Sequence, residues 1–272
     1  MLSRLTTLRR AHGWPGVAEA VHADLGRAEW PQTPEHVERT AAEAGVALVV
    51  VRRVKGDLLA RIEERMHTVS TLDPTRPAKP FWPSPMQRYC TSDLKRGPIQ
   101  KHTRTHRGVV VVSAQGMRAA ESSGRAKKPV LTVDERISAK HFAGLTPAEA
   151  VALHPERGGR LVLNWLPLHD WTEADVWNEL GSSLEDLDRR RAVFAAGFHA
   201  VALHGWAAHP AYILGNERLS CALCVLASRR DLVNGARHNP ALLAAYIALE
   251  KRSGYTFRDG LSLSEIAAEA TA

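Results

Sequence analysis

The spacing of apolar residues predicts alternating strands and helices along the first two thirds of the chain. A period near 3.6 predicts helices, which fall at residues 4–12, 34–44, 58–69 and 172–180. Apolar runs predict strands buried in a sheet, at residues 17–22, 46–52, 108–113 and 160–165. Strand, helix and strand in this order predict βαβ units, and therefore an α/β fold with a doubly wound, mostly parallel sheet.

The remaining segments do not follow the alternation of strands and helices. Prolines at residues 74–85 predict an extended surface loop, and residues 92–105 predict a basic helix broken near Gly97 and Pro98. Residues 119–160 are polar and loop-rich. From residue 190 onward the pattern is mostly helical. We therefore expect two domains, an α/β domain over residues 1–180 and a helical C-terminal region over residues 181–272.

Composition narrows the class of protein. The 272 residues carry a formal net charge of +7, which suits an anionic small molecule and also permits nucleic-acid binding. No apolar run approaches the roughly 20 residues that a membrane helix needs, and the first residues lack the apolar region of a signal peptide. The expected location is the cytoplasm, without a membrane partner.

The three cysteines favour metal or redox chemistry, because an odd, small number does not make a disulfide framework. Cys221 and Cys224 form a C-x-x-C, which brings two thiolates to one metal, and Cys90 lies far upstream. Three interpretations stay open: an iron–sulfur cluster, zinc with a fourth ligand from His209 or His102, and free or redox thiols.

Five segments stand out in order along the chain: residues 22–26 with 30–33, residues 88–95, residues 116–122 with Arg125, residues 167–172 with 175–177, and residues 209–212 with Gly215, Arg218 and 220–224. Together they resemble the phosphoadenylyl-sulfate (PAPS) reductase family of PP-loop proteins with the adenine nucleotide α-hydrolase fold. The resemblance spans roughly residues 17 to 260, and it implies that the α/β domain at residues 1–180 binds a nucleotide.

The resemblance implies that ATP or another adenine nucleotide binds at the carboxyl ends of the strands. His22, Asp24 and Gly26 would border the adenosine. Residues expected at the ribose or phosphate are Gly116, Arg118, Glu121, Ser122 and Arg125. Catalytic charge would come from Lys95, Arg118 and Arg218. Glu121 has a second interpretation, a structural ion pair with Arg125 one helical turn on.

Two features depart from the family pattern. The glycine-rich phosphate loop between the first strand and the first helix has no counterpart. We expect that Met1 lies inside a longer reading frame, and the alternative is a shortened protein with impaired triphosphate chemistry. Residues 260–272 contain no cysteine, whereas the reductases of the family carry a C-terminal one that attacks the sulfonyl sulfur. This second departure argues against thiol-mediated reduction.

The resemblance extends to a component of DNA phosphorothioation systems. It implies a 4Fe–4S cluster on Cys90, Cys221 and Cys224, with one iron open for sulfur transfer or activation. In that mechanism ATP adenylylates a substrate oxygen, and sulfide then displaces AMP. One alternative is a sulfonucleotide reductase that uses an external thiol. Another is a hydrolysis-dead scaffold that binds DNA, RNA or a complex partner through the basic stretch at residues 95–107. A homodimer is left open.

Overall fold

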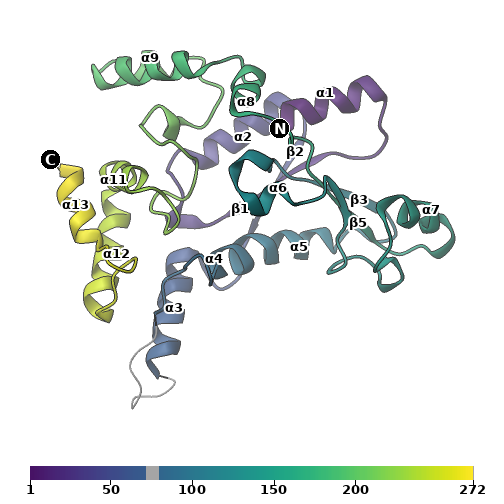
Figure 1. The fold of residues 1–272 in the computed structure, drawn as a ribbon, viewed down its shortest axis with the longest axis horizontal. Coiled ribbons are helices and arrows are strands. Elements are labelled where there is room, and N and C mark those ends of the chain that lie inside the picture. The colour runs from purple at the N-terminus through teal and green to yellow at the C-terminus, as the bar shows by residue number, and fades with distance from the viewer. Residues whose placement is uncertain (72–79, 272) are drawn as a thin grey trace. The chain divides into compact units, whose positions relative to one another are not determined.

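The computed structural model describes residues 1–71 and 80–271. The chain has the expected α/β class, with a helical C-terminal region (Figure 1). It divides into two compact units, unit 1 (Met1–Ala20, Thr40–Val49 and Ile99–Leu184) and unit 2 (Val21–Arg39, Val50–Pro98 and Glu185–Ala272). Both units combine separate stretches of chain, and the domain limits expected at residue 180 stay a prediction. Among the described helices, none is long and apolar enough to cross a membrane.

Some elements continue from one unit into the other. They are β1 (Glu19–Asp24), α2 (Thr33–Ala44), β2 (Ala47–Arg52), α5 (Gly97–Thr103) and α9 (Leu184–Ala195). Strands β1 and β2 pair in a two-stranded sheet. The bounds of α2 and β2 lie within one residue of the expected ranges, and β1 lies two residues later than expected. Strand β2 is partly exposed along its length rather than buried on both faces.

Unit 1 is built on a three-stranded sheet in the order β3 (Val110–Ala114), β5 (Leu161–Trp165) and β4 (Leu131–Val133). Strands β3 and β5 are parallel, as expected from a crossover connection, whereas β4 is antiparallel to β5. The first three residues of central β5 are buried, but Val112 of edge strand β3 is 53% exposed. An apolar run therefore did not identify a strand covered on both faces.

Unit 1 also contains four helices and two 3-10 turns among its described residues. They are α1 (Leu2–His12), α6 (Ser123–Ala126), α7 (Pro147–Arg157) and α8 (Glu173–Glu179), with 3-10 turns η3 (Ala119–Glu121) and η4 (Lys140–Phe142). Helix α7 lies beside β4 and β5 and covers the core around Phe142 and Ala150 (Figure 1). It falls in a segment expected to be loop-rich. The missed signal was its capping box, in which Thr146 and Glu149 exchange hydrogen bonds.

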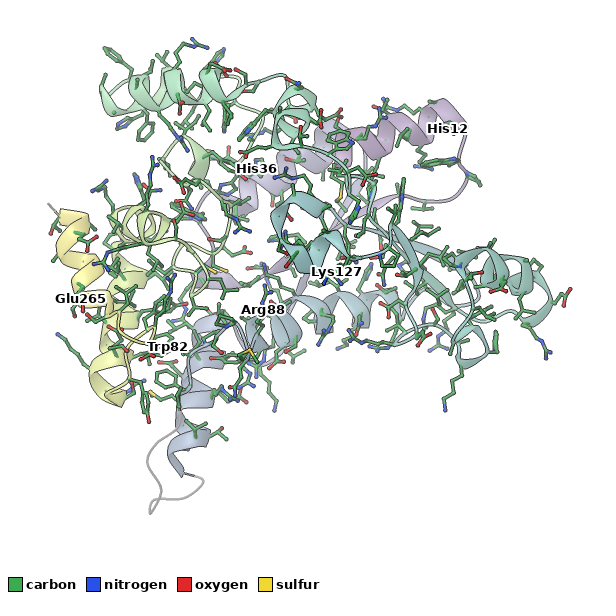
Figure 2. The ribbon with its side chains drawn as sticks, viewed as in Figure 1. His12, His36, Trp82, Arg88, Lys127 and Glu265 are labelled. Atoms are coloured by element: carbon green, nitrogen blue, oxygen red, sulfur yellow. The ribbon has the colours of Figure 1, made fainter. Side chains whose placement is uncertain are left out.

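Unit 2 holds the larger core. Its elements are η1 (Gly26–Ala28), α3 (Leu58–Thr71), α4 (Tyr89–Thr91), the π-helical turn η2 (Ser92–Arg96), α10 (His199–Leu203), η5 (Pro210–Tyr212), α11 (Arg229–His238), α12 (Pro240–Ser253) and α13 (Leu263–Thr271). Helices α11, α12 and α13 pack on one another (Figure 1). Trp82, labelled in Figure 2, packs against Tyr246 of α12 and against Phe257.

Two loop expectations changed in unit 2. The proline-rich segment was expected on the surface, and its residues 74–79 lie outside the described residues. Phe81 and Trp82 of the same segment are instead buried in the core, because a large aromatic surface is costly to expose to water. The expected break at Gly97 is instead a π-helical turn that leads directly into α5. Such turns are frequent at functional sites.

Glu250 on α12 supplies a test of this core. It is 8% exposed, and its carboxylate accepts backbone N–H groups from Phe257 and Leu263, which holds the connection into α13. Replacement Glu250→Ala leaves two buried donors unsatisfied, so we expect the free energy of unfolding to fall by about 3 kcal/mol in urea titrations. Exposed Glu63 serves as the control, and Glu63→Ala should change stability by less than about 0.5 kcal/mol. Equal losses in the two variants would contradict a buried acceptor at Glu250.

Candidate functional site

The C-x-x-C turn of unit 2 is held by the segment that follows β1. The backbone N–H of Ala222 donates to the carbonyl of Ala28 at 2.9 Å. The indole of buried Trp30 donates to the carbonyl of Ser220 at 3.1 Å. The turn is thereby fixed to two points of a segment almost two hundred residues earlier in sequence.

Helix α11 supports the other side of the turn. Gly235 faces the Ala222 carbonyl so closely that an added Cβ would lie 1.8 Å from the oxygen. Any other residue here would push the turn away from the helix. Nothing in the sequence marks Gly235, because a glycine inside a helical pattern has no local signal for a tertiary contact.

Cys90 lies on α4, in a segment anchored by its neighbour Tyr89. The buried Tyr89 hydroxyl donates to the carbonyl of Phe81 at 2.6 Å, and Arg61 and Arg65 stack over its ring at 5.0 and 5.2 Å. Cys90 and Cys221 are half-buried against the same apolar core of unit 2. The fold therefore brings the upstream cysteine to the core that carries the C-x-x-C.

Electrostatics link the thiols to each other and to two cations. Burial raises the pKa of the Cys221 thiol to about 12, Lys95 opposes this rise, and Cys224, Cys90 and Glu29 add to it. Lys95 is exposed on η2 directly after α4. Lys95, Cys90 and Cys224 thus each lie within electrostatic range of Cys221.

Arg258 is a further cation at this site, which the sequence did not reveal. It is half-buried, its guanidinium donates to the carbonyls of Ala227 and Cys224, and its Nε has no hydrogen-bond partner among the described residues. Burial lowers its pKa, and the charge of Cys224 opposes this shift. The Cys224 sulfur also accepts the backbone N–H of Leu226 at 3.4 Å. Such donors stabilise anionic sulfur.

A closed zinc site and an iron–sulfur cluster require different spacings of the three thiols. A single zinc at about 2.3 Å from each sulfur requires sulfurs about 3.8 Å apart. Within residues 1–71 and 80–271, the three thiols are not grouped within 4.8 Å of one another. Each cysteine of a cluster binds a different iron, so wider spacing suits it.

His209, one suspected fourth zinc ligand, already uses both ring nitrogens. Its Nδ1 accepts the N–H of Ala211 at 3.1 Å, and its Nε2 lies 3.0 Å from the Thr33 hydroxyl. Burial is the main cause that lowers the pKa of His209 to about 4, and the charge of His36 lowers this pKa further. The ring of His36, labelled in Figure 2, contacts the His209 ring edge to face. His209 is therefore a neutral core histidine. His102, the other candidate, contacts Glu19 in unit 1.

The predicted adenosine-bordering residues lie at the end of β1. His22 pairs with Glu29 at 3.2 Å. Asp24 accepts the Gly26 N–H and the Arg52 guanidinium, each at 2.6 Å. Gly26 has a φ of +65°, and a Cβ there would lie 2.5 Å from that of Asp57. His22 and Asp24 thus stabilise the segment after β1 that binds the C-x-x-C turn. Their nucleotide roles stay predictions.

The predicted phosphate-binding residues lie in unit 1, where β3 and β5 end side by side. Gly116 and Arg118 follow β3, and the N–H of Ala119 donates to the carbonyl of His169 after β5 at 2.7 Å. Parallel strands gather ligand-binding residues at this edge. His169 was not predicted; its Nε2 lies 3.1 Å from the Arg125 carbonyl, and this bond, aided by Asp170, raises its pKa.

Glu121 has the structural role that was left open. Its carboxylate pairs with Arg125 and lies 4.0 Å from the Arg118 guanidinium. Ser122 caps α6 by accepting the Arg125 N–H at 3.2 Å. The i,i+4 ion pair is confirmed, and ligand contacts by these residues stay predictions. Of the remaining predicted cations, Arg218 is exposed in unit 2, in the loop before Cys221.

The comparisons with known proteins give one finding. A family model, the phosphoadenosine phosphosulfate reductase domain, matches residues 5–183. No curated protein matches the chain.

The Gly235 contact yields a prediction. Replacement Gly235→Ala should displace the cysteine turn and lower the free energy of unfolding by about 1–3 kcal/mol, since the added methyl group has no space. Urea titration gives the stability, and mass spectrometry after alkylation gives the accessibility of Cys221 and Cys224, which should rise. Gly124→Ala is the matched control, because a Cβ there meets nothing within 4 Å. Wild-type behaviour of Gly235→Ala would show that the turn does not rest on α11.

Burial of Cys221 yields a second prediction, for protein freed of metal with a chelator. A thiol pKa raised to about 12 leaves little thiolate at pH 8.5, where an ordinary cysteine is about half ionised. We expect iodoacetamide to modify Cys221 at least about tenfold more slowly than in the urea-unfolded chain. The rate should keep rising with pH toward 12. Equal rates in folded and unfolded protein would contradict the burial.

Proposed function

This chain belongs to the phosphoadenosine phosphosulfate reductase domain family, and on that premise we propose an iron–sulfur protein that binds an adenine nucleotide and acts in sulfur transfer or activation. Membership by itself supports a sulfonucleotide-related function. The cluster, the nucleotide and the sulfur-transfer step are the parts that we add.

The observation that carries the proposal is the gathering of three cysteines with two cations in unit 2. Cys90, Cys221 and Cys224 would hold a 4Fe–4S cluster. When bound, such a cluster with three protein ligands supplies an iron with one position open to sulfide or substrate. Lys95 and Arg258 would offset the negative charge of the thiolates.

The charged side chains at the ends of β3 and β5 support the nucleotide. Arg118 and His169 lie where parallel strands β3 and β5 end, next to the Glu121–Arg125 pair. Basic side chains at this edge suit a phosphate or sulfate group. We propose that Arg118 binds the anionic end of the nucleotide, because Glu121 pairs directly with Arg125 and lies 4.0 Å from Arg118.

The recipient of the sulfur is the finer part of the proposal. Nucleic-acid modification would suit the net charge of +7, while an external thiol would make the same site a sulfonucleotide reductase. A sulfonucleotide reductase would release sulfite from adenylyl sulfate or its 3′-phosphate, whereas a nucleic-acid-modifying enzyme would not.

The first test is the metal content after anaerobic purification. We expect about four iron and four acid-labile sulfide per chain, with broad visible absorption, and loss of both in Cys221→Ala. Arg218→Ala, an exposed change in the same loop, should retain the cluster if Arg218 acts on substrate rather than on folding. Zinc without sulfide in the wild-type protein would refute the cluster and the proposed sulfur chemistry.

The second test is nucleotide affinity. Arg118→Ala should weaken binding of an adenine nucleotide, measured by calorimetry, by about tenfold or more, because a charge-assisted contact is worth about 1.5–3 kcal/mol. Arg157→Ala, an exposed change on α7 of the same unit, is the control and should bind like wild type. Equal affinities in the two variants would remove Arg118 from the nucleotide site.

A further inference from the structure

A second group of metal-ligating side chains lies in unit 1. Glu19 begins β1, His102 is on α5, and His106 follows three residues after that helix ends (Figure 1). The Nε2 atoms of His102 and His106 lie 2.6 and 3.2 Å from the same carboxylate oxygen of Glu19. All three ligand atoms lie within 4.8 Å of one another.

The backbone explains why both histidines face Glu19. They are four residues apart, a spacing that puts side chains on one helical face. Past the end of α5 the chain stays in tight turns, because Thr105 donates its N–H to the His102 carbonyl at 2.8 Å and His106 donates to that of Thr103 at 3.2 Å. Arg160 holds this turn by donating to the carbonyl of Arg104 at 3.1 Å.

This arrangement divides the basic stretch at residues 95–107. His102 and His106 are partly buried against Glu19, whereas Lys101, Arg104 and Arg107 are exposed to solvent. Two of the residues expected in a phosphate or nucleic-acid patch are therefore turned toward a carboxylate. The remaining cations can still attract anions from the outer face.

We propose that Glu19, His102 and His106 bind one divalent transition-metal ion of the zinc class. Two imidazole nitrogens and one carboxylate oxygen are the protein ligands of open zinc sites, which keep a fourth position for water or substrate. Tetrahedral zinc with bonds of about 2.0–2.1 Å needs ligand atoms about 3.3 Å apart. The present distances approach this value, so small movements of the three side chains admit the ion.

Exposure makes the site accessible. The side chains of Glu19, His102 and His106 are 28%, 20% and 37% exposed, so an ion can enter without unfolding. The donors are nitrogen and oxygen, whereas those of the cysteine site are sulfur. This inference goes beyond the proposed function and depends on different residues, so either can fail alone.

The competing interpretation is a hydrogen-bonded cluster in which Glu19 orients the two rings and no ion binds. It explains the short distances equally well. It predicts no metal affinity and no shared effect of His102 and His106 on metal binding. A metal titration therefore decides between the two.

The experiment is a Co²⁺ titration of the intact protein, followed by absorption spectroscopy and calorimetry. We expect one ion whose spectrum lacks thiolate charge-transfer bands and which Zn²⁺ displaces. His106→Ala and His102→Ala should each weaken binding at least about 100-fold, since loss even of an outer-sphere partner costs 10–100-fold. His12→Ala, an exposed histidine of the same unit, should retain the ion.

Two controls keep the result decisive. Cys221→Ala should leave this ion in place, which separates it from failure or success of the cluster proposal. Glu19→Gln removes the carboxylate with little change in side-chain volume. If a histidine variant does not fold, Glu19→Gln takes its place in the titration, and a thermal unfolding curve checks that Glu19→Gln itself is folded. No binding by wild-type protein, or equal binding by His106→Ala and His12→Ala, would overturn the metal site.

Discussion

The candidate cluster site depends on one steric constraint, the contact between the backbone of α11 and the C-x-x-C turn. Gly235 has no side chain, so the Ala222 carbonyl can approach the helix to a distance that a methyl group would forbid. The same turn is bonded on its other side to Ala28. Because it is held between a helix and the segment that follows β1, the turn presents Cys221 to the core that also carries Cys90. The positions of the Cys221 and Cys224 backbones are thereby set by packing of the main chain rather than by flexible side chains.

The electrostatic design of unit 2 follows from that packing. Half-burial penalises the thiolate form of Cys221, so an anionic cysteine needs nearby positive charge or a bound metal. Lys95 and Arg258 supply this positive charge from two separate segments. Lys95 lies in the π-helical turn after α4, and Arg258 lies in the segment before α13. Arg258 keeps an unpartnered Nε among the described residues, a cost that a free surface arginine would not bear. Its presence is easiest to explain if the site carries negative charge.

The histidines show how one residue type takes different roles. His209 is neutral and fully hydrogen-bonded in the core, His169 joins the ends of two strands through the Arg125 carbonyl, and His102 turns toward Glu19. All three were present in segments that carry the family resemblance or the basic stretch. The ring environment, and not the sequence position, separates a core histidine from a candidate ligand.

The sequence by itself determined the α/β class, most element positions, the family and the residue types of the candidate cluster site, since period, capping residues and the C-x-x-C are local patterns. Thr172, for example, is of a residue type that favours an N-cap, and its side chain caps α8 by accepting the N–H of Asp175. Only the tertiary structure decided which apolar runs are buried, because covering a strand depends on neighbours far away in sequence. It also revealed Gly235, Arg258 and the pairing of Glu19 with His102. These depend on contacts between distant segments, and no periodicity along the chain encodes which two distant segments will meet.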